Sequence, residues 1–165
     1  MSPSKDCSQM REMITDIWCC LGQAIIAVTT NGSVTDNLRA IMGRGTARQA
    51  AERFPELPGQ LGRLLRSHGK HVHELAHGLT SFPVEETPWS LPDIRLIRRS
   101  AEELRLLADQ QGWPLIVVPR PGCGGGGMAW DEVRPVLEQC FDVRFVVVTN
   151  GLQSVGNEAR RNIRR

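Results

Sequence analysis

The glycine-rich stretch between Pro119 and Pro135, "PRPGCGGGGMAWDEVRP", is the feature of the sequence that most strongly suggests chemistry. Five of its residues are glycines: Gly122, Gly124, Gly125, Gly126 and Gly127. Glycine loses more backbone entropy on folding than any other residue and adds no side chain to a core, so this run indicates that bare backbone is needed. Consecutive amides before a helix can bind an anion, and phosphate is the natural candidate. The alternative is a flexible surface turn.

A second glycine-bearing loop, with Gly43 and Gly45, follows the apolar run at residues 23–30 and also leads into a helix. Two loops of this kind predict a diphosphate held from two sides. Neither has the glycine followed by Lys-Ser or Lys-Thr of a P-loop, and neither is a dinucleotide-binding Gly-x-Gly-x-x-Gly fingerprint. Arg44 is the only cation within the two loops, and it either contacts phosphate or faces solvent.

Cysteine and histidine give weaker signals. The five cysteines are an odd number without a disulfide-scaffold or zinc spacing, and neither a signal peptide nor a long apolar run is present, so we expect a reduced, cytoplasmic protein. His71 and His73 are two apart on an expected strand and could face a metal together, but no third ligand is apparent. We therefore predict no metal and no cofactor.

The elements that must position the loops alternate along the chain. Apolar, β-branched runs at residues 23–30, 115–119 and 143–149 are typical of strands covered on both faces. Helical spacing extends from Pro92 to a capping glycine at Gly112, and another helix is expected to begin near Asp131. Residues 47–67 predict two helical pieces broken around Pro55 and Pro58, and residues 70–75 and 78–84 predict two short strands. This order predicts an α/β fold, a three-layer α/β/α sandwich with a mixed central sheet.

Length and charge limit the partners. The 165 residues fit one domain, with a core over about residues 12–150 and loose termini at residues 1–10 and 152–165. A net charge of +2 gives no general reason to expect a polyanionic partner, so nucleic acid is not implied, and no membrane segment is expected. We predict a monomer.

Five motifs in order then resemble a known family. They are "TDIW" at residues 15–18, "TTNG" at 29–32, "MGRGTARQAAERFP" at 42–55, "SFPV" at 81–84 and "RPGCGGGGMAWDEVRP" at 120–135. Together they are similar to a macro domain, in the branch that includes ADP-ribose 1''-phosphate phosphatases and ADP-ribosyl glycohydrolases. The resemblance extends over residues 12–149.

The resemblance implies a role for each matching residue. Asp16 would accept a hydrogen bond from the adenine amino group, with Ile17 supporting it through the backbone, and Asn150 would lie beside the adenine. Asn31 would face the distal ribose. The first loop would hold that ribose and a phosphate, and the second would wrap the diphosphate. The first loop comprises Gly43, Arg44, Gly45, Thr46 and Ala47, and the second comprises Gly122, Cys123, Gly124, Gly125, Gly126 and Gly127. Cys123 would pack and supply its amide rather than act as a nucleophile.

Two departures from the family bear on catalysis. Glu85 stands where the glycohydrolases of this branch carry a nucleophilic lysine, and Gly126 stands where they can carry an acidic residue. The remaining route is attack by a water held by Asn31 and by the ligand's own phosphate. Glu85 or Glu86 would be its general base, or both would simply be solvated.

The predicted ligand is therefore ADP-ribose or a mono-ADP-ribosylated protein. One hypothesis is a hydrolase that releases ADP-ribose from an acidic side chain, with Asn31 and Glu85 as catalytic residues. The alternatives are a reader that binds ADP-ribose without chemistry, which the missing lysine favours, and an ADP-ribose 1''-phosphate phosphatase.

Overall fold

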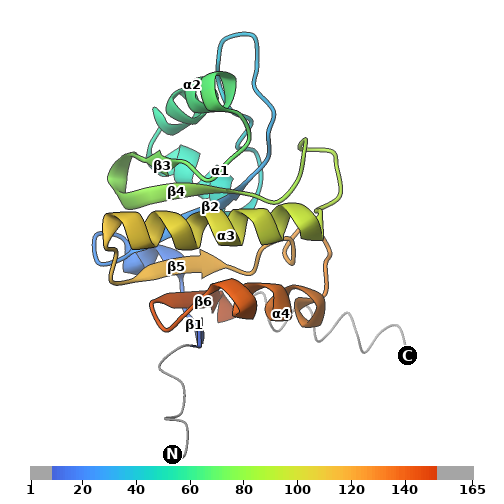
Figure 1. The fold of residues 1–165 in the computed structure, drawn as a ribbon. Helices are drawn as coiled ribbons and strands as arrows, with labels where there is room; N and C mark the ends of the chain where they lie inside the picture. Colours follow the sequence, from blue (N-terminus) through green and yellow to red (C-terminus); the bar gives the residue numbers. More distant parts are fainter. Residues whose placement is uncertain (1–8, 152–165) are drawn as a thin grey trace, which may run out of the picture.

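Six strands form one mixed sheet in the computed structural model, which describes residues 9–151 (Figure 1). The strands are β1 (Arg11–Ile14), β2 (Ile25–Thr30), β3 (Glu74–Leu75), β4 (Leu79–Pro83), β5 (Ile116–Pro119) and β6 (Phe145–Thr149). Their order is β1-β6-β5-β2-β4-β3, and every neighbouring pair is parallel except β3 with β4. Parallel strands bring their carboxyl ends to one edge of the sheet, so the loops that follow them meet there.

Helices cover both faces of the sheet. They are α1 (Gly45–Arg53), α2 (Leu57–His68), α3 (Ile94–Gln111) and α4 (Trp130–Cys140), with short 3-10 helices at Ile17–Cys20 (η1) and Ala76–Gly78 (η2). Side chains of β2 alternate between two cores: Ile26 and Val28 pack with α1, α2 and η1, whereas Ala27 packs with α3 and α4. The predicted three-layer α/β/α sandwich with a mixed sheet is confirmed.

The helix boundaries follow the local signals in the sequence. Asp93 caps α3 by accepting a hydrogen bond from the Arg95 amide, and Gly112 ends that helix in the left-handed conformation, as predicted. Pro55 separates α1 from α2. Pro58, by contrast, lies in the first turn of α2, where its missing N–H costs nothing, so it does not break a helix.

The expected strand at residues 70–75 is wrong for most of its length. Only Glu74–Leu75 pairs with β4, and His71 and His73 precede it in irregular backbone. Their side chains are also engaged separately: His71 Nδ1 lies 2.6 Å from a Glu103 carboxylate oxygen, and His73 Nε2 lies 2.8 Å from the Gly69 carbonyl oxygen. The Val72 amide donates 3.2 Å to Glu103 Oε2 and the His73 amide donates 2.8 Å to Ser81 Oγ, so side chains take these amides away from strand pairing.

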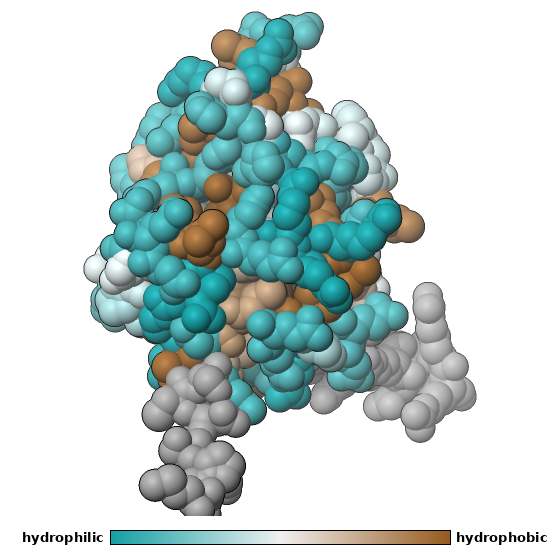
Figure 2. Space-filling view, viewed as in Figure 1, coloured by the Kyte–Doolittle hydropathy of each residue, from teal (hydrophilic) through white to brown (hydrophobic). Residues whose placement is uncertain are grey.

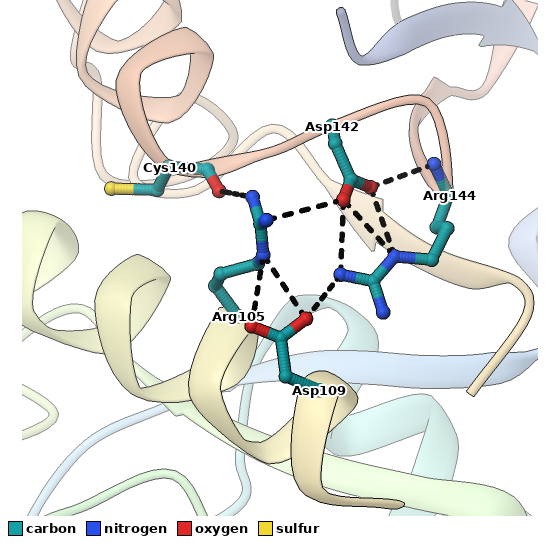
Figure 3. A network of polar contacts seen from close by, with 5 residues as sticks. All are labelled: Arg105, Asp109, Cys140, Asp142 and Arg144. Atoms are coloured by element: carbon teal, nitrogen blue, oxygen red, sulfur yellow. Dashed lines mark hydrogen bonds and ion pairs between the residues drawn. The ribbon is translucent and has the colours of Figure 1, made fainter. Parts of the chain in front are cut away.

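A network of ion pairs closes the amino edge of the sheet. Arg105 and Asp109 near the end of α3 contact Asp142 and Arg144, which precede β6 (Figure 3). Arg105 also donates 3.0 Å to the Cys140 carbonyl at the end of α4. Each of these four charged side chains is therefore paired with an opposite charge at this edge.

The expected loose termini lie almost entirely outside residues 9–151. Within that range, no helix is both long and apolar enough to cross a bilayer.

Candidate functional site

A cavity of about 450 Å³ lies at the carboxyl edge of the sheet. It is lined by Thr15, Asp16, Ile17, Trp18, Gly45, Thr46, Gln49, Glu52, Arg53, Pro119, Val148 and Asn150. These residues come from the segment after β1, from α1 along its whole length, and from the carboxyl ends of β5 and β6. Five predicted ligand-binding residues are among them: Asp16, Ile17, Gly45, Thr46 and Asn150.

Asp16 lies at the mouth of this cavity and also shapes its wall. Its Oδ1 accepts a hydrogen bond of 3.0 Å from the Trp18 amide and so caps η1. The carboxylate is exposed, and no hydrogen bond from the residues described engages its Oδ2. One carboxylate oxygen therefore fixes the local backbone while the other faces outward.

One wall of the cavity consists of residues outside the predicted ligand-binding set. Trp18 is buried, its Nε1 donates 2.8 Å to Gln49 Oε1, and the Arg53 guanidinium lies 4.8 Å from the centre of its ring. Gln49, Glu52 and Arg53 share one face of α1, at helical spacings of three and four. That spacing was the signal in the sequence for these cavity residues, because residues on the same helix face as a binding loop can line the same cleft.

The first loop presents an open helix N-terminus to the cavity. Arg44 occupies the N-cap position in extended conformation and makes no side-chain cap hydrogen bond, and no acidic residue lies in the first turn. A Cβ atom added at Gly43 or Gly45 would meet nothing within 4 Å. Thr46 fixes the loop to the sheet, since its hydroxyl accepts 3.3 Å from the Thr29 amide. An uncapped N-terminus of this kind attracts anions through its amides and its dipole.

The second loop contains two kinds of glycine. Gly122 has φ +74 and packs against Ile97, Pro92 and Met128, while a Cβ at Gly126 would lie 2.4 Å from Pro92 Cγ and 2.7 Å from the Gly122 carbonyl oxygen. The other three glycines, Gly124, Gly125 and Gly127, have nothing within 4 Å of such an atom. Only these three glycines therefore have free space where a side chain would be.

Hydrogen bonds within the second loop already occupy some of its amides. The Met128 amide donates 3.0 Å to Gly122, the Gly127 amide 3.3 Å to Gly124 and the Cys123 amide 3.3 Å to Arg120. Burial raises the pKa of the Cys123 thiol to about 11, so this cysteine is a neutral thiol near pH 7. That protonation state agrees with the expected packing role.

Asn31 is buried at the end of β2, where both ends of its side chain are engaged. Its Nδ2 donates 2.9 Å to the Ile41 carbonyl, and its Oδ1 accepts 2.9 Å from the Ser33 amide. These bonds hold the chain that leads from β2 to the first loop. Asn31 does not line the cavity of 450 Å³.

Glu85 lies beside the first loop, as its predicted role requires. Its side chain is mostly buried, and its Oε1 is 3.9 Å from an Arg44 guanidinium nitrogen. Burial raises the pKa of Glu85, and Arg44 opposes that shift only in part. Glu86 instead forms an ion pair with Lys70. Of the two glutamates considered as bases, only Glu85 contacts a loop residue.

No group of three or more side chains that could hold a metal ion occurs within residues 9–151, at His71 and His73 or elsewhere.

Comparisons with known proteins place this geometry among solved structures. The sequence matches no protein-family model and no curated protein. The fold is similar to the macrodomain of Mycobacterium tuberculosis DarG, with 18% identity, a TM-score of 0.69, and coverage of 87% of this chain and 99% of that chain. It is also similar to an Oceanobacillus iheyensis macrodomain carrying the mutation D40A, with 16% identity, a TM-score of 0.60, and coverage of 92% and 90%.

A third similar structure contains a ligand. Thermosipho africanus DarTG was solved in complex with ADP-ribose; it is 16% identical to this chain, with a TM-score of 0.67, and the match covers 84% of this chain and 41% of that one. The resemblance that the sequence motifs indicated therefore extends to the whole architecture of the described residues, and the chain has the macrodomain fold.

Proposed function

We propose that this protein binds ADP-ribose in the cleft at the carboxyl edge of the sheet. The observation that carries the proposal is the uncapped N-terminus of α1, which opens beside the cavity that also contains Asp16. Amides and a helix dipole suit a diphosphate, and the outward oxygen of Asp16 suits the amino group of adenine. The ADP-ribose complex of the similar Thermosipho africanus protein supports the same ligand class.

We further propose that the protein hydrolyses a mono-ADP-ribosyl ester on an acidic side chain. Glu85 takes a proton from water, the water oxygen bonds to the anomeric carbon of the distal ribose, and the bond from that carbon to the protein carboxylate breaks. The products are ADP-ribose and a free carboxylate. The second Nδ2 hydrogen of Asn31 is available to orient the water, because an amide nitrogen has two hydrogens and only one is bonded to Ile41.

Incubation with a protein mono-ADP-ribosylated on glutamate tests this chemistry through the release of ADP-ribose. The raised pKa of Glu85 gives a signed expectation: the rate increases with pH as Glu85 loses its proton, with a midpoint above the ordinary value of 4.5. Glu85→Gln should lower the rate by about 10²-fold or more and remove that acid limb. A Glu85→Gln variant with the parent rate would show that Glu85 is not the base.

A non-catalytic reader is the second candidate, and the crowding at Gly126 favours it. An acidic side chain at that position would collide with Pro92 and with the Gly122 carbonyl, so the loop cannot carry the acidic residue that the resemblance associates with this place. Unchanged substrate together with measurable ADP-ribose binding would favour the reader. A cytoplasmic monomer stays our prediction from composition.

A further inference from the structure

The segment between β4 and α3, residues 85–92, exposes two large apolar side chains beside the cleft. Trp89 and Leu91 are each 83% exposed, more than any other large hydrophobic residue within residues 9–151. The face of the molecule shown in Figure 2 is mainly hydrophilic, with hydrophobic residues in separate areas. Tryptophan is rarely left in water at this level, and an exposed aromatic side chain at the rim of a cleft often contacts a partner.

This segment is attached to both glycine loops. The Arg44 guanidinium of the first loop donates to the Pro88 carbonyl, and Pro92 packs against Gly122 and Gly126 of the second. The Gly32 amide, at the end of β2, donates 3.0 Å to the Glu86 carbonyl. Trp89 and Leu91 therefore lie on a segment that contacts both loops. Glu85, at the start of the same segment, lies beside Arg44 of the first loop.

The turn that carries Trp89 is held in one conformation by its own hydrogen bonds. The Thr87 hydroxyl lies 2.7 Å from the Ser90 hydroxyl and accepts from the Ser90 amide at 3.1 Å and the Trp89 amide at 3.3 Å. A side chain presented on a fixed turn loses little further entropy on binding. The exposure of Trp89 is thus a property of an ordered turn.

The charges around these two side chains indicate the class of partner. Each carboxylate of the segment and its flank has a cation beside it: Glu85 has Arg44, Glu86 has Lys70, and Asp93 has Arg95. The six charges sum to zero. A nucleic acid backbone needs surplus cations, whereas an aliphatic leucine next to a tryptophan suits the apolar side chains of a polypeptide.

We infer that Trp89 and Leu91 contact the polypeptide that carries the ADP-ribosyl group, through an apolar side chain near the modified residue. This inference rests on the proposed function, because it takes the distal ribose to lie at Glu85. Free ADP-ribose should not touch this surface. The two side chains would therefore select among modified proteins without altering affinity for the nucleotide.

The test measures two ligands by calorimetry. One is free ADP-ribose, and the other is a peptide with ADP-ribose attached to its glutamate position through a non-hydrolysable linkage and with leucine next to it. The unaltered protein should bind the peptide more tightly. Trp89→Ala should weaken peptide binding about tenfold and Leu91→Ala about threefold, with free ADP-ribose unchanged. Both side chains are exposed, so the melting temperatures should stay near that of the parent.

Two controls make the result specific. Leu106→Ala removes an exposed leucine in the second half of α3, away from the start of the helix at Ile94. It should change the affinity neither for the peptide nor for free ADP-ribose. A peptide with alanine in place of its leucine should lose its advantage with the parent and show no further loss with Trp89→Ala.

Parent-like peptide affinity in Trp89→Ala would overturn the inference. An ADP-ribosylated oligonucleotide is titrated as a further ligand, and a loss of affinity in Trp89→Ala that is confined to this oligonucleotide would also overturn the inference. If the unaltered protein fails to bind free ADP-ribose, the proposed function itself is contradicted, and this inference falls with it. Normal binding of free ADP-ribose with no effect at Trp89 would contradict the inference alone.

Discussion

The two glycine loops both begin with Gly-x-Gly but have different surroundings in the fold. The first loop ends in an uncapped helix without acidic residues in its first turn, and the glycines at positions 43 and 45 face open space. The second loop leads to α4, whose first turn carries Asp131 and Glu132, and its glycines at positions 122 and 126 are packed against Pro92. A carboxylate at a helix N-terminus competes with a bound anion for the same dipole.

This difference assigns separate tasks to the loops. We expect the α1 N-terminus to be the stronger anion site, because no acidic residue lies in the first turn of that helix. The second loop combines packing glycines, which let the loop approach Pro92 closely, with the exposed amides of Gly124 and Gly125, which can cover a phosphate. We therefore propose that the glycine-rich stretch meets two different needs, close packing against Pro92 and ligand binding.

Gly45→Val should produce the largest effect on binding. Valine at φ +55 is strained, and its branched side chain would cover the amides at the start of α1, so ADP-ribose affinity should fall by more than 100-fold in calorimetry. Gly112→Val is the matched control, with φ +66 at the end of α3 and open space around it. It should lose similar thermal stability yet bind normally. Equal binding loss in both variants would indicate general damage to the fold.

Gly125→Val should abolish most ADP-ribose binding with only a small change in the melting temperature of the free protein. Nothing within 4 Å opposes the new side chain, but it would occupy the approach of the phosphate oxygens. The stabilisation by ADP-ribose, which follows mass action on the folded state, should disappear. Normal affinity would mean that the exposed part of the second loop is only a turn.

Gly126→Ala should give the opposite result within the same loop. Its methyl group would press on the Pro92 ring and the Gly122 carbonyl, so the protein should lose about 1–3 kcal/mol of unfolding free energy, measured by urea denaturation. An unchanged denaturation midpoint would show that Gly126 is not a packing glycine.

Asp16→Ala should weaken ADP-ribose binding by about 1.5–3 kcal/mol, because it removes a charge-assisted hydrogen bond. It also removes the cap of η1, which costs about 1 kcal/mol of stability. Asp16→Asn separates the two contributions, since an amide oxygen still caps the helix but has no charge. Parent-like affinity in both variants would place the adenine elsewhere.

Arg144→Met should have the smallest effect and none on ADP-ribose binding, since it lies at the amino edge. Hydrogen bonds from Arg144 hold the pKa of Asp109 below its usual value. Burial tends to raise the pKa of Asp142, but hydrogen bonds from Arg144 outweigh burial, so this pKa is lowered as well. Groups with a depressed pKa stabilise the fold above their unfolded pKa and lose that effect as pH falls through the folded value.

The melting temperature of Arg144→Met should therefore be lower than that of the parent by about 2 °C at pH 7. The difference should shrink below about pH 4, where the carboxylates become protonated. A difference that grows on acidification would contradict this sign.

The sequence predicted the layers well because the signals for them are local. The strands at residues 25–30, 116–119 and 145–149 lie within apolar, β-branched runs, and Gly112 could be recognised as the residue that ends α3. The parallel order of the strands likewise predicts where the candidate site should lie, since parallel strands share a carboxyl edge.

What the sequence could not predict depends on contacts between distant segments. The crowding of Gly126 comes from Pro92, on another loop, and the bond from Asn31 to Ile41 depends on the path of the intervening chain. Arg53 joins the cavity only because α1 packs beside η1 and places its guanidinium over Trp18. The contacts of Gly126 and Asn31 have no local signature, and for Arg53 the sequence shows only that it shares a helix face with Gln49 and Glu52.

Calorimetric titration of the unaltered protein with ADP-ribose and with AMP tests the central claim most directly. AMP can reach Asp16 and the adenine end of the cavity, but only ADP-ribose also spans the α1 N-terminus and reaches Glu85. We predict binding of ADP-ribose that is at least tenfold tighter than binding of AMP. Equal affinity for the two ligands, or no binding of either, would contradict the account.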